Sequence, residues 1–317
     1  MAKIMVTGAT GLLGRALVKQ LQQVNAHQVI ACGYSRVGEG EFQLDLTQNQ
    51  QVTDFIALHQ PQVIVHCAAE RRPDISEQDP QAALALNADA TRTLAQAARD
   101  NGAWLLYIST DYVFDGTQPK YTEKAATNPV NFYGESKLLG EKIIAEVAAQ
   151  FAVLRLPILY GEVQTLEESA VTVLLRSLQD GFKPSVAKPA TLPVDDWAVR
   201  SPTSTEDIAL AIEKLLNLQL AGESITGHYH FSAAQTMTKY QMLLQMAKVL
   251  NVSTEHLQPV TSPTDSAKRP KDCTLSCERL MSLGIKSTLP FASGITKALQ
   301  QSVVVQQWLK QVDERQS

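Results

Sequence analysis

The amino-acid sequence predicts an α/β protein built on a doubly wound parallel sheet, with a smaller α/β domain towards the C-terminal end. Short runs of β-branched and apolar residues alternate with longer amphipathic stretches through the first half of the chain. This alternation is typical of βαβ units, whose right-handed crossovers place successive strands in one parallel sheet. A glycine-rich segment at residues 7–14 (TGATGLLG) joins the first predicted strand to the first predicted helix. Together these features predict a fold of the Rossmann type.

The predicted elements alternate regularly as far as residue 156. Apolar residues recur at helical spacing in the segment 13–23. The segment 62–67 (QVIVHC) is apolar almost throughout, as expected of a strand that is covered on both faces. The predicted strands are 3–7, 28–33, 62–67, 104–109 and 151–156, and the predicted helices are 13–23, 52–59, 80–101 and 133–149.

Beyond residue 160 the pattern is less regular. Residues 181–200 contain several prolines and show no period, so they are predicted to form a loop. Helices are predicted at 168–179, 205–216, 238–250 and 294–312, and a strand at 228–232. We therefore expect a larger domain from residues 1–160 and about 201–227. A smaller substrate or partner domain is expected from about 161–200 and 228–317.

The composition excludes several classes of protein. Of the 317 residues, 44% are hydrophobic and 19% are charged, which favours a packed core over disorder. The net charge of −4 argues against a basic surface for nucleic acid. The four cysteines form no CxxC pair and no cluster with metal-ligand spacing, so no metal role is predicted. No apolar run reaches the roughly 20 residues of a membrane span, and no signal-peptide pattern is present. We expect a cytoplasmic protein.

The glycine-rich segment has the context of a dinucleotide-binding loop. Gly8, Gly11 and Gly14 follow a predicted strand and open a predicted helix. Glycines permit a tight turn and allow the backbone to approach a pyrophosphate, while the helix N-terminus supplies free N–H donors. A glycine triplet elsewhere would indicate only a tight turn. Its position between strand and helix favours cofactor binding.

The end of the second predicted strand favours NADP(H) over NAD(H). An NAD site usually places a carboxylate there, about 20 residues after the glycines. This chain has Tyr34, Ser35 and Arg36 instead, and a hydroxyl and a guanidinium would suit a 2′-phosphate. A solvated loop arginine is the alternative. Asp45 and Leu46 lie where an adenine ring often packs, although Asp45 would also serve as an ordinary helix cap.

Tyr133 and Lys137 form a candidate acid–base pair. Of the eight tyrosines, only Tyr133 has a lysine four residues later, on the same face of a helix. We expect the ammonium group to lower the pKa of Tyr133, so that the phenol exchanges a proton with a carbonyl or alcohol oxygen. Thr110 ends a predicted strand, where its hydroxyl would hydrogen-bond that oxygen. A capping role at the strand–loop junction is the alternative for Thr110.

Four segments together resemble the extended short-chain dehydrogenase/reductase superfamily and, within it, the dTDP-4-dehydrorhamnose reductase family. They are TGATGLLG (7–14), STDYVFDG (109–116), NFYGESK (131–137) and RPKDCTLSCERL (269–280). The chain is still more similar to one branch, the regulatory β-subunits of methionine adenosyltransferase. That resemblance rests on HCAAERRPD (66–74), RLPILYGEV (155–163), LEESAVTV (166–173) and MTKYQM (237–242).

The resemblance implies a role for each matching position. Around the cofactor pyrophosphate it places Gly8, Thr10, Gly11, Leu12, Leu13 and Gly14. It places Tyr34, Ser35 and Arg36 at the 2′-phosphate, Asp45 and Leu46 at the adenine, and Cys67, Ala68, Ala69 and Arg71 in the next loop of the site. Tyr133, Lys137 and Leu159 would face the nicotinamide, with Thr110, Tyr133 and Lys137 as the reductase triad. Asp111, Tyr112 and Arg269 would lie on the substrate side.

Two departures from the reductases bear on the substrate. The sugar-nucleotide reductases usually carry Ser-Trp where this chain has Pro157 and Ile158, so an aromatic contact with the sugar is lost. The Glu70–Arg71–Arg72 segment also differs from what the reductases lead us to expect. Cations for a substrate diphosphate are expected from Arg71, Arg72, Lys268 and Arg269, each of which could also be a solvated surface charge.

Two functions follow, with different partners. The first is an NADPH-dependent reductase of a 4-keto nucleotide sugar. The second is a non-catalytic NADP-binding regulatory subunit whose partner is a methionine adenosyltransferase catalytic subunit. Residues 303–317, with Trp308 and Leu309, would dock that partner, although a terminal helix packed on its own domain is favoured. An epimerase or dehydratase is less favoured, because Asp111-Tyr112 rather than Asp-Glu follows Thr110. A homodimer is a further expectation.

Overall fold

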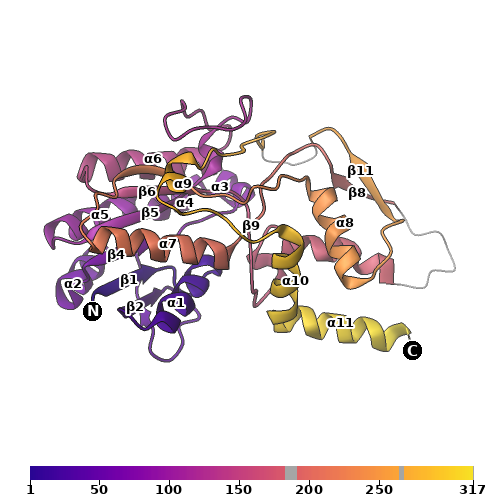
Figure 1. The fold of residues 1–317 in the computed structure, drawn as a ribbon, viewed down its shortest axis with the longest axis horizontal. Helices are drawn as coiled ribbons and strands as arrows, with labels where there is room; N and C mark the ends of the chain where they lie inside the picture. The colour runs from indigo at the N-terminus through magenta and orange to yellow at the C-terminus, as the bar shows by residue number, and fades with distance from the viewer. Residues whose placement is uncertain (183–190, 264–267, 317) are drawn as a thin grey trace.

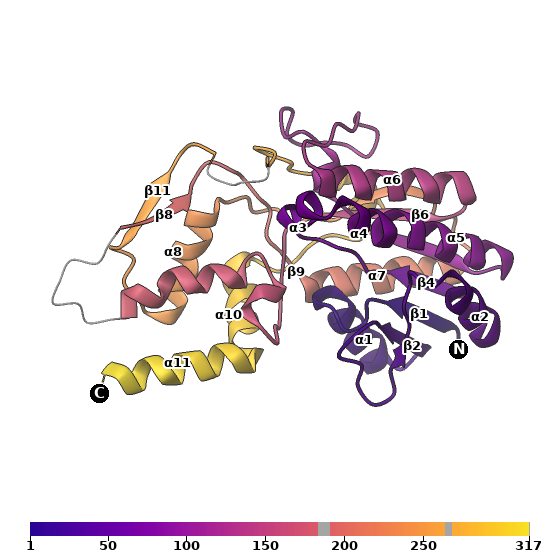
Figure 2. The same ribbon diagram turned by 180° about the vertical axis from the view of Figure 1, so that it is seen from behind.

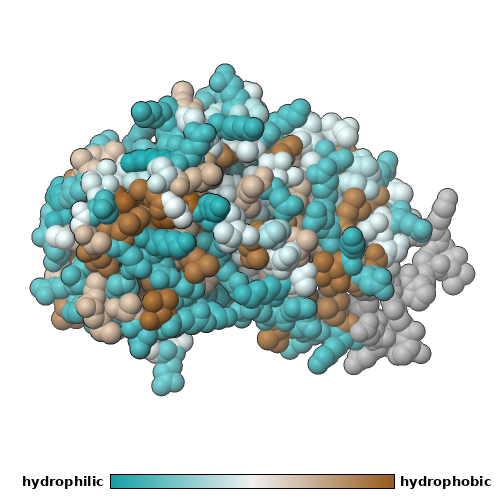
Figure 3. Space-filling view, in the orientation of Figure 1, coloured by the Kyte–Doolittle hydropathy of each residue, from teal (hydrophilic) through white to brown (hydrophobic). Residues whose placement is uncertain are grey.

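A computed structural model describes residues 1–182, 191–263 and 268–316 of the chain. It has two lobes: a large parallel sheet with its helices, and a smaller lobe that contains α8, α10 and α11 (Figures 1 and 2). On the face drawn in Figure 3 most side chains are hydrophilic, and apolar groups are confined to separate patches. Within the described residues, none of the helices combines the length and apolar character that a bilayer span requires.

The large sheet has seven strands, all parallel, in the order β10-β6-β5-β4-β1-β2-β3. The strand order reverses between β1 and β4, and ligands of doubly wound sheets bind at the carboxyl edge of such a switch point. The strands are β1 (Lys3–Thr7), β2 (Gln28–Gly33), β3 (Phe42–Gln43), β4 (Val63–His66), β5 (Trp104–Thr110), β6 (Ala152–Leu156) and β10 (Gly227–His230). The doubly wound α/β fold predicted from the sequence is confirmed.

Helices cover both faces of this sheet. On one face α1 (Leu12–Val24) packs on α7 (Thr205–Leu220), and on the other α5 (Ala90–Asp100) packs between α2 (Asn49–His59) and α6 (Phe132–Val147) (Figures 1 and 2). Their apolar stripes meet the sheet in one core, in which strand residues such as Ile4, Leu105 and Leu154 are fully buried.

The helix predicted at residues 80–101 is divided into three parts. It consists of α4 (Pro80–Leu84), a π-helical turn η1 (Ala85–Asp89) and α5, and it follows the short α3 (Pro73–Gln78). The carbonyl of Asn87 in the π turn accepts hydrogen bonds from the hydroxyls of Thr91 (2.9 Å) and Tyr107 (3.4 Å). Tertiary contacts therefore stabilise a backbone that helical periodicity does not reveal.

The second lobe has a core of its own, in which Tyr160, Met242 and Phe291 are buried. A parallel pair of strands, β8 (Leu192–Asp195) and β11 (Leu257–Val260), lies beside α8 (Lys239–Leu250), which begins with a Thr238–Gln241 capping box. The described elements of this region also include β7 (Leu159–Tyr160), η3 (Leu166–Glu168), η4 (Thr172–Phe182), β9 (Thr203–Ser204), α10 (Phe291–Gln301) and α11 (Val303–Gln316), whereas α9 (Glu278–Ser282) lies against β10 of the large sheet. Strand β7 pairs with β9.

Several predictions for this half of the chain are wrong. Strand β8 falls in the expected loop 181–200, of which 183–190 lie outside the described residues. The expected helix 168–179 is mainly the 3₁₀ segment η4. The expected helix 294–312 is interrupted at Ser302, whose hydroxyl donates to the carbonyl of Ala298 (2.6 Å) and accepts from the N–H of Val163 (2.9 Å). Strand β8 and the break at Ser302 each depend on a partner that is distant in sequence.

The boundary expected between residues 227 and 228 also changes. Strand β10 pairs with β6 at the edge of the large sheet, and Leu280 and Ile285 pack in the core of that sheet. After β9 the chain therefore lies in the first lobe twice, with α7 and β10 over residues 205–230 and again near 278–285.

A glycine holds α6 against β5, and its substitution should destabilise the fold. A Cβ at Gly140 would lie 2.2 Å from the hydroxyl oxygen of Tyr107 and 2.8 Å from the carbonyl of Asn87. We expect Gly140→Ala to lower the free energy of unfolding by about 1–3 kcal/mol through overpacking, despite the better helix propensity of alanine. Urea unfolding measures this change.

Leu139→Ala on the same helix is the matched control, because its side chain is largely exposed. It should change stability by no more than about 0.5 kcal/mol. Equal stability of Gly140→Ala and the wild type would show that α6 shifts freely on β5 and is not fixed by this contact.

Candidate active site

A cleft of about 940 Å³ opens at the carboxyl ends of β1, β4, β5 and β6, between the two lobes. The residues that the resemblance assigns to the cofactor, the reductase triad and the substrate side all line this cleft. They are Gly8, Thr10, Gly11, Leu12, Leu13, Gly14, Tyr34, Ser35, Arg36, Asp45, Leu46, Cys67, Ala68, Ala69, Arg71, Thr110, Asp111, Tyr112, Tyr133, Lys137, Leu159 and Arg269.

The glycine loop brings two backbone turns into direct contact. Gly8 has a φ of +67°, and a Cβ there would lie 2.8 Å from the backbone nitrogen of Ala68. A Cβ at Gly14 would lie 2.1 Å from the carbonyl oxygen of Gly8. The N–H of Gly11 donates to that same carbonyl (2.9 Å), and α1 begins at the next residue. We call this turn, from Gly8 to Gly14, the cradle; side chains at Gly8 and Gly14 would not fit. The free N–H groups in the first turn of α1 border it, and they are the donors that a pyrophosphate needs.

The loop after β4 is held by Asn87 of the π turn. The side-chain carbonyl of Asn87 accepts from the N–H of Glu70, and its amide donates to the Glu70 carbonyl, both at 2.9 Å. The same amide also donates to the hydroxyl of Ser136 (3.0 Å) on α6. Asn87 therefore fixes the backbone beside Cys67–Arg71, although nothing in the local sequence singles it out.

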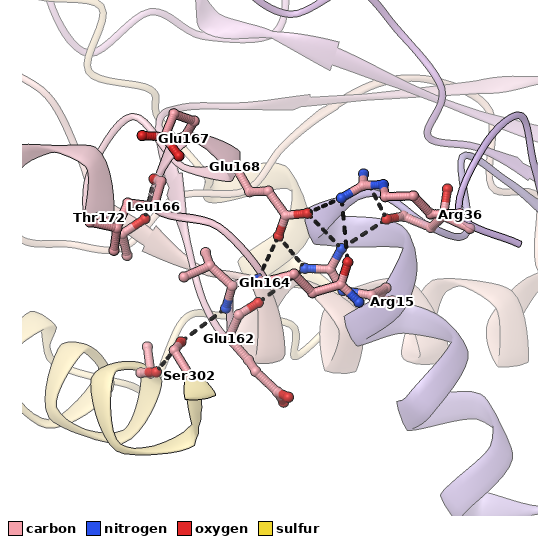
Figure 4. Close-up of polar contacts among 12 residues, drawn as sticks. Arg15, Arg36, Glu162, Gln164, Leu166, Glu167, Glu168, Thr172 and Ser302 are labelled. Carbon is pink, nitrogen blue, oxygen red and sulfur yellow. Dashed lines mark hydrogen bonds and ion pairs between the residues drawn. The ribbon is translucent and has the colours of Figure 1, made fainter. Parts of the chain in front are cut away.

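A carboxylate that the sequence analysis did not identify lies at the adenosine end of the cleft. Glu168 accepts from Arg36 (2.5 Å) and from Arg15 (2.6 Å), as Figure 4 shows. Burial opposes its ionisation, but hydrogen bonds from Arg15, from the N–H of Gln164 and from Arg36 lower the pKa of Glu168. No acid lies near Arg36 in the sequence, but the fold brings Glu168, 132 positions further along the chain, into contact with it.

At the opposite end, Lys137 is buried beneath Tyr133. Its Nζ donates to the carbonyl of Ile108 (2.8 Å) and lies 4.0 Å from the centroid of the Tyr107 ring. Burial lowers the pKa of Lys137 to about 7. Burial also raises the pKa of Tyr133, so the expected lowering by Lys137 is wrong for this state of the site. The reason is that the ammonium group is directed to a strand carbonyl and desolvation of the phenol dominates.

Thr110 and its two successors form a hydroxyl–carboxyl–phenol group at the end of β5. The Thr110 hydroxyl donates to the Asp111 carboxylate and accepts from the N–H of Tyr112, both at 3.2 Å. Burial raises the pKa of Asp111 to about 7, although the Arg200 guanidinium opposes this shift. The rings of Tyr112 and Tyr133 lie 5.9 Å apart, so Thr110, Tyr133 and the Asp111 carboxyl share one corner of the cleft.

Arg200 is a second residue that sequence reasoning missed. It is buried, lines the cleft, and lies with its guanidinium carbon 5.5 Å from the Tyr112 ring centroid. Its Nη1 donates to the carbonyls of Val199 (2.7 Å) and Lys271 (3.2 Å). Among the described residues its Nη2 has no hydrogen-bond partner. Arg200 falls at the end of the proline-rich stretch, where no local pattern marks it.

Only two of the four cations that were expected to bind a diphosphate line the cleft. Arg71 lines the cleft and donates to the carbonyl of Glu167 (3.1 Å), while Arg269 lines it and pairs with Asp74 (2.8 Å). Arg72 instead pairs with Glu70 beside it, and neither Arg72 nor Lys268 is part of the cleft lining. Lys239 of α8 joins the lining from the second lobe. Over the described ranges, no group of three His, Cys, Asp or Glu side chains has the geometry to hold a metal.

Behind Lys137 lies a buried ion pair. Glu141 accepts from Arg155 through both oxygens (2.9 and 2.7 Å) and from the hydroxyl of Ser109 (2.6 Å). Burial opposes its ionisation, but hydrogen bonds from Arg155 and His228 outweigh burial and lower the pKa of Glu141 to about 2. Lys137 and Glu141, one turn apart on α6, thus hold the consecutive β5 residues that precede Thr110.

Residues 2–304 match the family model described as the RmlD substrate binding domain. The chain belongs to this family. It is 44% identical over 311 residues to methionine adenosyltransferase 2 subunit beta of Bos taurus, which covers 98% of this chain and 91% of the relative. It is 32% identical over 298 residues to dTDP-4-dehydrorhamnose reductase of Streptomyces griseus, which covers 93% of this chain and 92% of the relative.

Among solved structures, dTDP-4-dehydrorhamnose reductase from Bacillus anthracis str. Ames in complex with NADP matches with a TM-score of 0.80 and 26% identity. The match covers 95% of this chain and 99% of that chain. The resemblance inferred from the sequence, to the reductases and to the β-subunit branch, is confirmed. Within the family, identity and fold extend over both lobes.

Two buried histidines should make the stability of this family member depend on pH. Burial lowers the pKa of His66 and of His230 to about 3. An unfolded chain protonates histidine near pH 6.5, so it binds protons that the native state does not. Stability conferred by the neutral histidines is therefore complete above about pH 6.5 and falls as the pH drops towards 3.

His66→Gln tests this linkage. Neutral His66 accepts from the Thr7 hydroxyl (2.7 Å) and faces the Thr91 hydroxyl (3.1 Å), and glutamine offers one acceptor and one donor without titrating. The free energy of unfolding is measured with denaturant at pH 7, 6, 5 and 4. Its fall per pH unit should be smaller in the variant, by up to about 1.4 kcal/mol. Parallel curves for the two proteins would contradict a neutral, buried His66.

Proposed function

We propose that this chain binds NADP(H) and reduces the keto group of a 4-keto nucleotide sugar. The observation that carries the proposal is the meeting of Thr110, Tyr133 and Lys137 with the glycine loop in one cleft. These two sets of residues come from opposite halves of the sheet, and a dinucleotide would lie between them across the switch point.

The residues present fit such a cofactor. A side chain at Gly8 or Gly14 would collide with neighbouring backbone, so only glycine allows this tight turn. The turn leaves the N-terminus of α1 open to the cleft. Arg36 and Ser35 would hold the 2′-phosphate, and Asp45 and Leu46 the adenine. A family relative has been solved in complex with NADP, which supports the choice of nucleotide.

The chain's own groups would supply the proton chemistry, and bound NADPH would supply the hydride. Tyr133 would donate its phenolic proton to the oxygen of the reduced carbonyl, and its raised pKa keeps it protonated before that step. Thr110 would hydrogen-bond the same oxygen after releasing Asp111. Lys137, with its pKa near 7, would orient the nicotinamide ribose and stabilise the phenolate left on Tyr133.

The substrate side is rich in cations. Arg71, Arg200, Lys239 and Arg269 line the part of the cleft that receives residues from the second lobe. Guanidinium and ammonium groups suit the diphosphate of a nucleotide sugar. Pro157 and Ile158 also line this part, in place of the Ser-Trp of the reductases, so we propose a sugar that needs no stacking contact there.

Tyr133→Phe is the direct test of the reductase. NADPH oxidation with a 4-keto deoxy-sugar nucleotide should fall by a few orders of magnitude, because the proton donor is removed. NADPH binding, followed by its fluorescence, should change little. Tyr240→Phe is the matched control, since it removes a phenol that is absent from the cleft lining and leaves the acid in place. Equal turnover by Tyr133→Phe and the wild type would contradict the assignment of Tyr133 as the acid.

A second function has its own support. Identity to the Bos taurus subunit beta exceeds identity to the Streptomyces griseus reductase, and Ile158 replaces the sugar-side aromatic residue. A regulatory subunit of a methionine adenosyltransferase would keep the nucleotide site and need no turnover. Within the C-terminal helix α11, Val305 is packed in the core of the second lobe, and Trp308 and Leu309 are half-buried against it.

Co-purification discriminates the two functions. The regulatory reading predicts that the full chain co-purifies with the methionine adenosyltransferase catalytic subunit of its own source and alters its KM or kcat. Tyr133→Phe should leave that effect intact, because association does not need the acid. Absence of a complex at micromolar concentrations, together with turnover of a keto sugar, would contradict this second function.

A further inference from the structure

One carboxylate neutralises the arginine that is expected to select NADP(H). Glu168 lines the cleft with Arg36, and its Oε1 lies 2.5 Å from Nη1 of that residue. Arg15 of α1 donates to both oxygens of the same carboxylate, at 3.2 and 2.6 Å. Both arginines also donate to the carbonyl of Thr10 in the glycine loop. The cluster is therefore part of the rim of the dinucleotide cleft (Figure 4).

The segment around Glu168 holds the carboxylate in place. Oε2 accepts from the N–H of Gln164 (2.9 Å), and the carbonyl of Leu166 accepts from the hydroxyl of Thr172 (2.9 Å). At the far end of the segment, the N–H of Val163 donates to Ser302 at the junction of α10 and α11 (Figure 4). Only 9% of the Glu168 side chain is exposed, against 52% for Arg36. Arg36 is thus the more exposed partner of this ion pair.

Charge decides what this arrangement does to each nucleotide. The 2′-phosphate of NADP(H) carries nearly two negative charges, so it would compete with Glu168 for Arg36 and be repelled by the carboxylate. NAD(H) has a 2′-hydroxyl at the same position, and a carboxylate is the usual acceptor for that hydroxyl in NAD sites. Glu168 therefore penalises one nucleotide and not the other.

We infer that Glu168 is a specificity-determining residue that narrows the preference of the site for NADP(H) over NAD(H). The inference rests on the proposed function only in requiring that the cleft binds a nicotinamide nucleotide. Glu168 supplies from the second lobe the acid that β2 lacks at its end. The protein then accepts both nucleotides to a degree set by the Arg36–Glu168 ion pair.

The neighbouring acids do not share this role. Glu167 pairs with Arg176, and Glu162 pairs with Lys19 (3.1 Å). Both of these acids have exposed side chains and are absent from the cleft lining. Glu167→Gln is thus a matched control, because it removes one negative charge from the same segment without touching Arg36.

The test is the affinity of the full chain for NADPH and NADH, measured by the fluorescence of the bound nucleotides. Glu168→Gln should tighten NADPH binding by roughly tenfold, because Arg36 becomes free for the 2′-phosphate. NADH binding should change by less than about twofold, because glutamine keeps a carbonyl oxygen that can accept from the 2′-hydroxyl. Retained NADH binding also shows that the variant is folded. Glu167→Gln should leave both affinities unchanged.

A double-mutant cycle with Arg36→Gln assigns the effect to this ion pair. The gain from Glu168→Gln should be clearly smaller when Arg36 is already replaced, because only the direct repulsion between the carboxylate and the phosphate then remains. Glu168→Asp, which keeps the charge but draws the carboxylate back from Arg36, should give a smaller gain in the same direction. It provides a second measurement should the glutamine variant be unstable.

The outcomes separate this inference from the proposed function. An unchanged ratio of NADPH to NADH affinity in Glu168→Gln, or a shift towards NADH, would overturn the inference while nucleotide binding stands. A gain of the same size in the Arg36→Gln background would overturn it too. Failure of the wild type to bind either nucleotide would overturn both the inference and the proposed cofactor site.

Discussion

The close approach of two backbone turns, at Gly8 and at Ala68, is the constraint on which the cleft depends. These turns follow β1 and β4, which are neighbours in the sheet. In the sequence, Val63 at the start of β4 lies 56 positions after Thr7 at the end of β1. The strand order reverses here, so the chain leaves the sheet in opposite directions and opens a crevice. Any side chain at Gly8 would force the turns apart. The cradle, the first turn of α1 and the loop held by Asn87 all follow from this contact.

Helix α6 transmits this constraint to the other end of the cleft. Tyr133, Lys137 and Glu141 recur at four-residue spacing on the face turned to β5. Tyr133 lines the cleft and Lys137 donates to the carbonyl of Ile108. Glu141, the deepest of the three, forms the buried pair with Arg155. A buried charge that loses its partner is strongly destabilising. The Glu141–Arg155 pair therefore disfavours any other register of α6 on β5 and β6. The helix thereby places the phenol of Tyr133 at the carboxyl edge of the sheet.

The second lobe completes the site in a different way. It contributes polar groups at the rim, notably Glu168, Arg200 and Lys239, while the first lobe supplies the backbone cradle. Reductase-type chemistry and a regulatory role both need the cradle, but they make different demands on the rim. This explains how one family can contain proteins named as dTDP-4-dehydrorhamnose reductase and as methionine adenosyltransferase 2 subunit beta.

The sequence by itself determined the features that depend on local pattern. Periodicity revealed the strands of the sheet, and the glycine spacing and the Tyr133–Lys137 spacing located both ends of the cleft, because each depends on residues close together in the chain. The tertiary structure alone decided the rest. Strand β8 exists through β11, the break at Ser302 through Val163, and the π turn through Tyr107. Likewise, desolvation raises the pKa of Tyr133, and Glu168 meets Arg36 from another lobe, because burial and charge act between residues that sequence order separates.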